Sequence, residues 1–475
     1  MRLAALTGGG EEALVTGFAI DHRKVAPGTV FGAFPGNRVN GEDFIADAVR
    51  SGAVAVVARP GARVEGAVHL SADEPRQRFA ALAAQFFAPF PQCCVAVTGT
   101  NGKTSTVEMT RQLWRMAGHP AASLGTLGVT TADERVTTGL TTPDVVTFLS
   151  NVAGLAREGV THLAFEASSH GLHQYRTEGL PVAAAAFTNL SRDHLDYHGD
   201  MAAYLTAKLR LFAEVLQPDG AAVVWADDAE AARVIDLARE RGNRLLTVGA
   251  RGCALKLVGR DPTLLGQMLS IEADGQVHRV RLPLIGAYQA ANALVAAGLV
   301  IATGGELAAT LANLARLQPV RGRLERAAIT RSGAPVYVDY AHTPDAVEAA
   351  AAALKPHAGG RLILVLGAGG DRDPGKREAM GQVAAAGADR VIVTDDNPRS
   401  ENPALIRAAV LKGARQADGD ATEIGDRRAA IAAAIADAGP DDIVLIAGKG
   451  HEQGQVVGDL VLPFDDVQVA RECAG

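Results

Sequence analysis

The sequence predicts an α/β protein built from parallel sheets and divided into more than one domain. Short apolar runs alternate with amphipathic, Ala-rich helical patterns along much of the chain, which is typical of strands and helices that form a parallel sheet. At 475 residues the chain is too long for one hydrophobic core. A glycine-rich turn at 98–105 joins one apolar run to a helical pattern. Together these observations predict two to four α/β domains.

The first block of the chain comprises residues 1–90. Strand-like runs at 30–34 and 53–57 lie around a helical pattern at 44–50. The proline-marked joint at 88–91 has the composition of a linker. We therefore expect a small first domain that ends near this joint.

Two larger blocks follow, at 91–318 and 319–475. The middle block alternates apolar strands with amphipathic helices, and the last block repeats that alternation. Each block therefore predicts a domain with a largely parallel sheet. The expected strands of the last block are residues 335–338, 362–366, 391–393 and 443–446.

The turn at 98–105 has the features of a loop that binds phosphate. An apolar run at 93–97 leads into it as a buried strand. Glycine lets backbone N–H groups approach phosphate oxygens, and the start of the next helix adds a positive dipole. Lys103 would reach the terminal phosphates of ATP, and Thr104 would offer its hydroxyl to Mg²⁺. The candidate ATP-binding residues here are Gly99, Thr100, Asn101, Gly102, Lys103, Thr104 and Ser105.

This loop departs from the long form of the phosphate-loop motif. The long form has glycine at position 97, where this chain has Val97. An ordinary turn between a strand and a helix is the alternative interpretation. The helical pattern after the loop, with Val107, Leu113 and Met116 on one face, and the apolar strand before it favour a loop that binds ATP.

Composition and charge argue against several classes of function. Lys and Arg total 46 against 53 Asp and Glu, a formal net charge of −7, so nucleic acid is not expected as a partner. The four cysteines have no metal-binding or redox spacing, which indicates a reducing compartment. The sequence shows neither a signal peptide nor an apolar run of about 18 residues. We expect a soluble, cytoplasmic protein without membrane insertion.

Polar residues of the middle block follow expected strands, at the edge where parallel sheets bind ligands. Glu166 ends the apolar run at 162–166, and a carboxylate beside a phosphate loop is a suitable Mg²⁺ ligand. A solvent-facing glutamate at the start of a loop is the alternative. After the run at 182–187, residues 193–200 contain two His and three Asp, which could ligate a metal or cap the next helix.

The last block carries polar clusters at 339–345, 367–377, 395–399 and 448–452. Any one of them alone could be a capped turn, but four such clusters at successive strand ends indicate a ligand-binding function. The Gly-x-Gly-Gly segment at 367–370 lacks the third glycine of a dinucleotide fingerprint, and we discount that function.

Together these segments closely resemble the Mur ligases of peptidoglycan synthesis, ATP-dependent enzymes that add amino acids to a UDP-muramoyl precursor. The resemblance covers nearly the whole chain. Asp-Asn-Pro-Arg at 396–399 resembles the signature of members that add meso-diaminopimelate rather than lysine. The other motifs that carry the resemblance are residues 98–104, 166–172, 189–199 and 339–345.

The resemblance implies three domains. The N-terminal domain, 1–90, would bind UDP, and the central domain, 91–318, would be a P-loop-type parallel-sheet ATPase domain. The C-terminal domain, 319–475, would be Rossmann-like and would deliver the amino acid. The implied substrates are UDP-N-acetylmuramoyl-L-alanyl-D-glutamate, meso-diaminopimelate and ATP, with Mg²⁺ as cofactor.

The resemblance also implies roles for individual residues. Lys103 and Thr104 would bind the ATP phosphates and Mg²⁺, Glu166 would bind one Mg²⁺ and His194 a second. Lys208 matches the family's carbamylated lysine, whose added carboxylate points towards the metal. Further nucleotide-binding positions are Asn292, Arg323, Asp339 and His342.

Two substrate sites follow from the same resemblance. The muramoyl-dipeptide site would comprise Arg23, Thr141, Thr142, Ser168, Gln174 and Arg176. The diaminopimelate site would comprise Arg372, Asp396, Asn397, Arg399, Gly448 and Glu452. Three positions near the uridine and adenine ends, Leu140, Gln289 and His22, depart from the family pattern.

These residues fit transfer through an acyl phosphate. The substrate carboxylate would take the γ-phosphoryl group of ATP, while Lys103 and Mg²⁺ neutralise its charge, and an amine would then displace phosphate. No nucleophile-plus-base constellation is needed. The alternatives left open are a ligase that adds lysine or ornithine, a folate polyglutamate ligase, and a P-loop switch that hydrolyses ATP to change shape.

Overall fold

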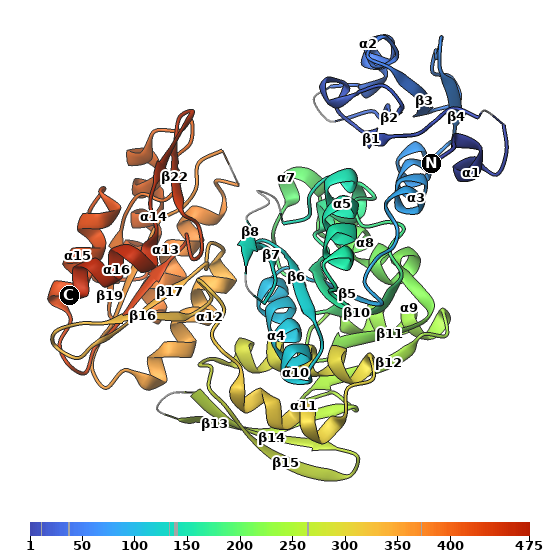
Figure 1. Ribbon diagram of the computed structural model, residues 1–475. Helices are drawn as coiled ribbons and strands as arrows, with labels where there is room; N and C mark the ends of the chain where they lie inside the picture. The colour runs from blue at the N-terminus through green and yellow to red at the C-terminus, as the bar shows by residue number, and fades with distance from the viewer. Residues whose placement is uncertain (11, 37–38, 133, 137–140, 264–265, 372) are drawn as a thin grey trace.

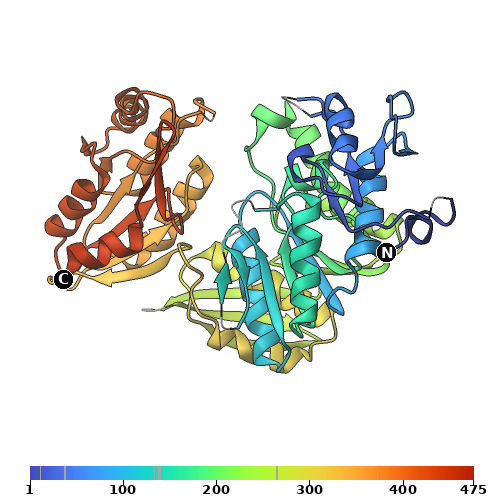
Figure 2. The same ribbon diagram turned by 45° about the horizontal axis from the view of Figure 1, so that its top comes forward.

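Three large sheets, each covered by helices, follow one another along the chain (Figure 1). Figure 1 and Figure 2 both place the N-terminal and C-terminal sheets on opposite sides of the central one. The α/β fold with largely parallel sheets that the sequence predicts is therefore confirmed. The computed structural model describes residues 1–10, 12–36, 39–132, 134–136, 141–263, 266–371 and 373–475.

The N-terminal sheet has four parallel strands in the order β1-β2-β3-β4. Its elements are α1 (Leu3–Thr7), β1 (Gly17–Ala19), η1 (His22–Lys24), β2 (Thr29–Gly32), η2 (Gly41–Phe44), α2 (Ile45–Arg50), β3 (Ala53–Ala58), β4 (Val68–Ser71) and α3 (Pro75–Phe87). Phe79 of α3 packs edge-on against Phe18 and Phe34. These aromatic contacts fix α3, which leads into the central sheet, against the N-terminal core.

The central sheet has the order β15-β14-β13-β12-β11-β10-β5-β9-β6-β7-β8, and its interior from β12 to β6 is parallel. Its strands are β5 (Cys93–Thr98), β6 (Ala121–Gly125), β7 (Gly128–Thr130), β8 (Arg135–Val136), β9 (His162–Glu166), β10 (Val182–Phe187), β11 (Leu216–Trp225), β12 (Arg244–Gly249), β13 (Leu255–Thr263), β14 (Gly266–Ala273) and β15 (Gln276–Leu282). Its helices are α4 (Lys103–Met116), α5 (Val145–Arg157), α6 (Ser169–His173), α7 (Leu195–His198), α8 (Met201–Arg210), η3 (Leu211–Val215), α9 (Ala231–Glu240), α10 (Ala287–Ala302), α11 (Leu307–Asn313) and η4 (Leu314–Arg316).

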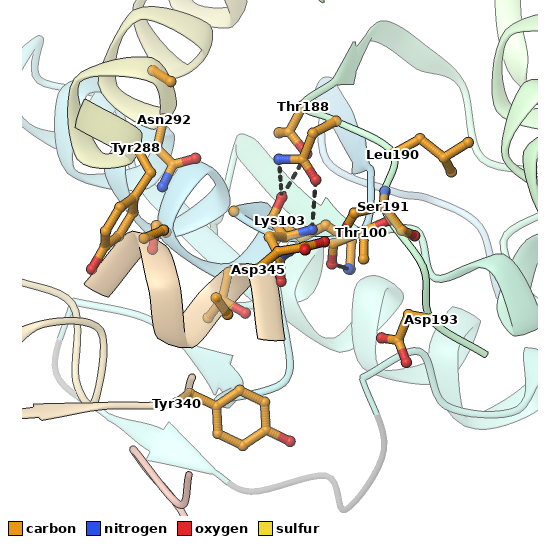
Figure 3. A pocket seen from close by; sticks show the side chains of 18 of the residues that line it. Thr100, Lys103, Thr188, Leu190, Ser191, Asp193, Tyr288, Asn292, Tyr340 and Asp345 are labelled. Carbon is orange, nitrogen blue, oxygen red and sulfur yellow. Dashed lines mark hydrogen bonds between the residues drawn. The ribbon is translucent and has the colours of Figure 1, made fainter. Parts of the chain in front are cut away.

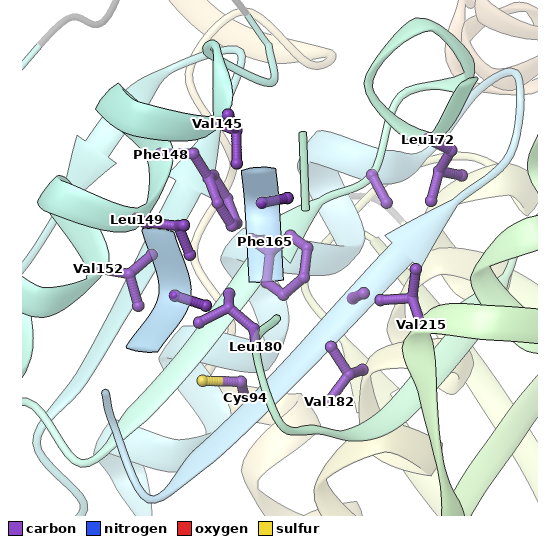
Figure 4. Close-up of a cluster of buried hydrophobic side chains, with 14 of the residues drawn as sticks. Cys94, Val145, Phe148, Leu149, Val152, Phe165, Leu172, Leu180, Val182 and Val215 are labelled. Carbon is purple, nitrogen blue, oxygen red and sulfur yellow. The ribbon is translucent and has the colours of Figure 1, made fainter. Parts of the chain in front are cut away.

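Strand β5, in the middle of this sheet, has a sequence that is apolar almost throughout. Cys94 and Ala96 face a core that also contains Phe148 of α5 (Figure 4). Val95 and Val97 face the opposite core, under α4 and α10. Because helices cover both faces, neither side of the strand needs polar residues. The carboxyl end of β5 then delivers the glycine-rich loop to the edge of the sheet.

The C-terminal sheet has the order β16-β17-β21-β18-β19-β20, parallel except for β16. The four strands predicted for this block are confirmed as β17, β18, β19 and β21. Its strands are β16 (Glu325–Ile329), β17 (Pro335–Asp339), β18 (Leu362–Leu366), β19 (Arg390–Val393), β20 (Ala421–Glu423), β21 (Ile443–Ala447) and the separate hairpin β22 (Gly454–Val457) and β23 (Leu460–Pro463). Its helices are α12 (Pro344–Leu354), η5 (Lys355–His357), α13 (Lys376–Gly387), α14 (Pro403–Gln416), α15 (Arg427–Asp437) and α16 (Asp466–Ala474).

No helix in the described ranges combines the length and the apolar character needed to cross a lipid bilayer.

Candidate active site

The glycine-rich loop between β5 and α4 is held against the end of β10. Thr188 Oγ1 donates to Asn101 O (2.7 Å), and Asn101 N donates to Asn189 Oδ1 (2.8 Å) (Figure 3). Gly102 has a φ of +86°, and a Cβ atom there would lie 2.3 Å from Asn292 Oδ1. Only glycine therefore fits where the loop passes α10.

Lys103, the first residue of α4, holds its ammonium group over this loop. Its Nζ donates to Gly99 O (2.9 Å) and to Thr100 O (2.7 Å). Burial lowers the pKa of Lys103, and the Glu166 and Asp193 carboxylates oppose that shift. An anion that enters the loop meets this lysine together with the N-terminus of α4.

The loop opens into a cavity of about 590 Å³ lined by residues of the central and C-terminal sheets. This volume suits a small-molecule ligand. The cavity brings together most of the residues that we expect to bind ATP and metal. Those that line it are Thr100, Asn101, Gly102, Lys103, Thr104, Ser105, Glu166, His194, Lys208, Asn292, Arg323, Asp339 and His342. Thr141 and Ser168 of the expected muramoyl-dipeptide site also line it.

Arg323 connects the two sides of this cavity. Its Nη2 donates to Thr104 Oγ1 (3.0 Å), and its guanidinium lies over the Tyr340 ring, 4.4 Å from the centroid. Within the described part of the chain, Arg323 Nε is buried without a hydrogen-bond partner. A buried, unpartnered guanidinium N–H beside a phosphate loop fits an anionic ligand.

Asp339, at the end of β17, ties the C-terminal sheet to α10. Its Oδ2 accepts from Leu324 N (2.6 Å) and from Tyr288 OH (3.4 Å). Burial raises the pKa of Asp339 to about 6. His342 Nδ1 donates to Tyr340 O (2.8 Å), which leaves Nε2 as the acceptor of the neutral ring.

Glu166, at the end of β9, is buried, with 1% of its surface exposed. The solvent-facing alternative is therefore wrong. Thr126 donates to Oε1 through its N–H (2.7 Å) and to Oε2 through its hydroxyl (3.1 Å). A Cβ atom at Gly125 would lie 2.2 Å from Oε1. The carboxylate is thus held in place from the neighbouring strand β6.

His194 stands in the left-handed region, with a φ of +54°. Its ring packs edge-on against His170, with centroids 4.8 Å apart, and burial lowers its pKa to about 4. The imidazole is therefore neutral at pH 7 and has a lone pair available for a metal.

The residues of the cavity fit a Mg²⁺ ion that binds together with a nucleotide. No group of three or more His, Cys, Asp or Glu side chains in the described ranges could hold a metal ion. Thr104 and Glu166 offer the oxygen donors that Mg²⁺ prefers, and both line the cavity. A Mg²⁺ ion here would take its remaining ligands from phosphate oxygens and water.

Lys208, on α8, is buried, with 1% of its surface exposed. Its Nζ donates to Gly99 O (2.7 Å) and lies 4.3 Å from the centroid of the Tyr204 ring. Burial, and after it the charge of Lys103, lowers the pKa of Lys208 well below its ordinary value. Lys208 is therefore buried inside the protein and is not a solvated lysine on a helix surface.

Residues of the expected muramoyl-dipeptide site form a connected network beside Glu166. Thr142 Oγ1 donates to Glu166 O (2.9 Å) and accepts from Ser168 N (3.2 Å). Arg176 donates to Thr142 O (2.6 Å) and to Gln174 Oε1 (2.8 Å). These two contacts hold the Arg176 guanidinium beside the cavity. Both acceptors are neutral oxygens, and neither is a carboxylate.

Arg23 lies apart from this network, in η1 of the N-terminal sheet. It pairs with Asp21 (2.8 Å), and its side chain is 78% exposed. The neighbouring His22 stacks on Phe44, with ring centroids 4.3 Å apart and an interplanar angle of 3°. Such a flat aromatic pair can stack on a nucleobase.

Most residues of the expected diaminopimelate site meet at the ends of β19 and β21. Asn397 Nδ2 donates to Glu452 Oε2 (2.8 Å). A Cβ atom at Gly448 would lie 2.7 Å from Asp396 Oδ2, so the two strand ends approach closely. Arg372 falls outside the described residues.

Arg399 follows this cluster and has a φ of +51°. Its backbone N–H donates to Val456 O of β22 (2.9 Å), and its Nη1 donates to Gly370 O (2.6 Å). The cap of the following helix is instead Asn402, which accepts from Ala404 N. Arg399 is therefore not the cap of this helix.

Four cavity residues lie outside every motif expected from the sequence, namely Thr126, Trp225, Asp228 and Tyr288. Trp225 ends the parallel strand β11, and Asp228 lies three residues beyond it. The rule that ligands bind at the carboxyl ends of parallel strands would have indicated both. Tyr288 carries no such local signal, because it begins a helix of apolar residues.

Three family models match the chain. "Mur ligase family, catalytic domain" matches residues 14–86, "Mur ligase middle domain" matches 97–300, and "Mur ligase, glutamate ligase domain" matches 322–450.

Similar proteins cover nearly the whole chain. A "UDP-N-acetylmuramoyl-L-alanyl-D-glutamate--2,6-diaminopimelate ligase" of Zymomonas mobilis is 60% identical over 96% of this chain and 94% of that protein. One of Caulobacter vibrioides is 50% identical over 96% and 94%. A solved structure with the same name has a TM-score of 0.73 and 33% identity, and covers 100% of this chain and 98% of that one. A folylpolyglutamate synthase of Mycobacterium tuberculosis shares the fold, with a TM-score of 0.64, 22% identity, and coverage of 78% of this chain and 92% of that one.

Lys103→Ala is expected to lower the rate of any ATP-dependent turnover by about 10²-fold or more, because it removes one preorganised charge from the phosphate loop. Steady-state phosphate release measures this. Lys412→Ala is the matched control, since Lys412 is 60% exposed and pairs with Glu378 on the surface of α14. A folded Lys103→Ala variant with nearly wild-type turnover would contradict the phosphate-loop assignment.

Proposed function

The chain belongs to the Mur ligase family, and we propose that it joins meso-diaminopimelate to UDP-N-acetylmuramoyl-L-alanyl-D-glutamate while ATP is converted to ADP and phosphate. As a member of this family it is an ATP-dependent amide ligase. The observation that carries the proposal is the meeting of the phosphate loop, Glu166 and the end of β17 around one cavity. The relatives named for 2,6-diaminopimelate support the choice of amino acid.

In the first step, an oxygen of the substrate's D-glutamate carboxylate bonds to the γ-phosphorus of ATP, and the bond from that phosphorus to ADP breaks. Lys103 and the Arg323 guanidinium face the phosphates and stabilise their charge as it redistributes. Thr104 and Glu166, with His194 for a second ion, would hold Mg²⁺, which supplies further positive charge at the phosphate oxygens. The product is an acyl phosphate.

In the second step, the neutral amine of the amino acid attacks the acyl carbon. Phosphate leaves with the electron pair of the broken C–O bond, and the amine nitrogen loses a proton as the amide forms. Binding both reactants between the central and C-terminal sheets makes this attack effectively intramolecular. The cavity walls also limit hydrolysis of the acyl phosphate by water.

We further propose that Lys208 carries a carbamate. Burial lowers its pKa and so favours the neutral amine, which is the form that attacks the carbon of CO₂. A bond from Nζ to that carbon forms, one proton leaves, and the lysine gains a negative charge. Nζ donates to Gly99 O (2.7 Å), so a carboxylate formed on this nitrogen would lie beside the phosphate loop.

A cytoplasmic location belongs to the same proposal. All four cysteines are free thiols in the structure, which accords with a reducing compartment.

Three alternatives remain as outcomes of the tests. Folate polyglutamate ligases share the fold, but the similar folate enzyme covers only 78% of this chain. A ligase that adds lysine or ornithine would need no partner for a second carboxylate at the far end of the amino acid. A P-loop switch would hydrolyse ATP without either substrate.

The proposed function is tested by phosphate release from ATP with UDP-N-acetylmuramoyl-L-alanyl-D-glutamate and a panel of amino acids. We expect release only with both substrates present, and the highest kcat/KM with meso-diaminopimelate. A preference for lysine or ornithine would overturn the proposed substrate. Release from ATP with neither substrate present would indicate the switch.

Arg399→Ala is expected to lower kcat/KM for diaminopimelate far more than for lysine. A guanidinium can bind the extra carboxylate of diaminopimelate through two parallel N–H bonds, and lysine leaves those N–H groups without that partner. Sites built to bind a polar group of the substrate reject an analogue that lacks this group by roughly 10⁴-fold. The ratio of the two kcat/KM values measures the effect, with the exposed Arg415→Ala on α14 as control. An equal loss for both amino acids would contradict this role.

Lys208→Ala is expected to lower turnover strongly and to regain part of it with added formate or acetate, which would replace the lost carboxylate. Removal of CO₂ and bicarbonate should lower the activity of the wild type but not of the variant. The ¹³C NMR signal of a carbamate after exposure to ¹³CO₂ provides a direct measurement. A wild type that is fully active without CO₂ and shows no such signal would refute the carbamate.

A further inference from the structure

We infer that Lys449 is a positioning residue of the amino-acid pocket. It lies behind Asp396, Asn397 and Glu452 and holds these side chains in the arrangement that receives the amino acid. The inference rests on the proposed function, because that function makes the cluster a substrate pocket. None of the expectations drawn from the sequence assigns a role to this lysine.

Lys449 is completely buried, with 0% of its surface exposed. Its Nζ lies 2.9 Å from Asn397 Oδ1, 3.4 Å from Asp396 Oδ1 and 3.4 Å from Glu452 Oε2. An ammonium group has three N–H donors, and these three contacts account for all of them. Each contact goes to a side chain of the pocket.

The contact with Asn397 sets the direction of its amide group. Asn397 Oδ1 accepts from Lys449 Nζ and from Val456 N (2.9 Å), which occupies both of its lone pairs. The Nδ2 group must then point the other way, where it donates to Glu452 Oε2 (2.8 Å). This bond uses one N–H, and the second N–H of Asn397 is available for a ligand.

The charges of the cluster suit the amino group of a substrate. Asp396 and Glu452 bring two negative charges together in a half-buried to buried setting, and Lys449 balances one of them. One negative charge therefore remains for an ammonium group. Arg399, at the far side of the same loop, adds a positive charge for a carboxylate. The two ends of the pocket thus complement a zwitterion.

A second buried cation, Arg427, connects the strands behind the pocket. Arg427 pairs with Asp466 (2.6 Å) and donates to Ala447 O (3.0 Å) and Asp395 O (3.3 Å). These bonds join the ends of β21 and β19 to α15 and α16. Because Arg427 supplies this framework, the bonds of Lys449 to pocket side chains indicate a role in substrate binding.

Lys449→Met and Lys449→Gln test this role, since methionine keeps the volume and glutamine keeps a polar end without the charge. We expect Lys449→Met to raise the KM for the amino acid by about 30-fold or more, as for removal of one partner of a buried charge pair. Lys449→Gln should raise it less. The KM values for ATP and the UDP-linked substrate should stay within about twofold, with Lys412→Met on the surface as the matched control.

Positional isotope exchange in ATP without amino acid measures the first step separately. Both variants should retain it, because Lys449 serves only the second substrate. An unchanged amino-acid KM would overturn the inference, and so would loss of the exchange reaction in both variants, which would show that Lys449 supports the fold.

The wild type separates this inference from the proposed function. Its amino-acid preference decides the substrate, and the variants are compared on whichever amino acid it uses. A wild type that prefers lysine would overturn the diaminopimelate assignment. The KM values of the wild type and the Lys449 variants for lysine would still decide whether Lys449 positions the pocket.

Discussion

The hydrogen bond from Arg323 to Thr104 joins the phosphate loop of the central sheet to the segment that begins the C-terminal sheet. Asp339 supports the same junction, because it accepts from Leu324 beside Arg323 and from Tyr288 of α10. The cavity exists only where these two sheets meet. Any change in their relative position therefore alters the ATP site and the distance to the amino-acid pocket together, which links nucleotide binding to the approach of the second substrate.

Positive charge is concentrated on one side of this junction. Lys103 and Lys208 both donate to the carbonyl oxygen of Gly99, at 2.9 and 2.7 Å. Burial lowers the pKa of both lysines, and the charge of Lys103 lowers the pKa of Lys208 further. When both lysines are protonated, their ammonium groups repel each other at one carbonyl oxygen, so phosphate anions or the proposed carbamate would relieve that repulsion. The same arrangement thus favours both ATP and a modified Lys208.

The charged groups of the proposed amino-acid pocket are arranged differently from those of the phosphate loop. The carboxylates of Asp396 and Glu452 pair with the buried Lys449. Arg399 lies on the loop that the hairpin β22–β23 holds through backbone hydrogen bonds. Separation of the two signs within one pocket orients a substrate that carries both. The positive φ of Arg399, +51°, is maintained by backbone bonds to that hairpin, so the hairpin holds the residue that we propose selects the amino acid.

The sequence by itself determined the α/β fold class, the strand–loop–helix unit around Lys103 and the polar clusters after each parallel strand, because apolar periodicity and glycine positions are local signals. The resemblance to a known family, and not a local signal, added Asn292, Arg323, Asp339 and His342, which line the same cavity. The burial and the contacts of Lys208, Arg323 and Lys449 depended on tertiary structure. Lys208 meets Gly99 across 109 residues, and Arg323 meets Thr104 across 219. Burial and partner choice at such separations arise only when helices and sheets pack, and no local pattern distinguishes a solvated lysine from a buried one.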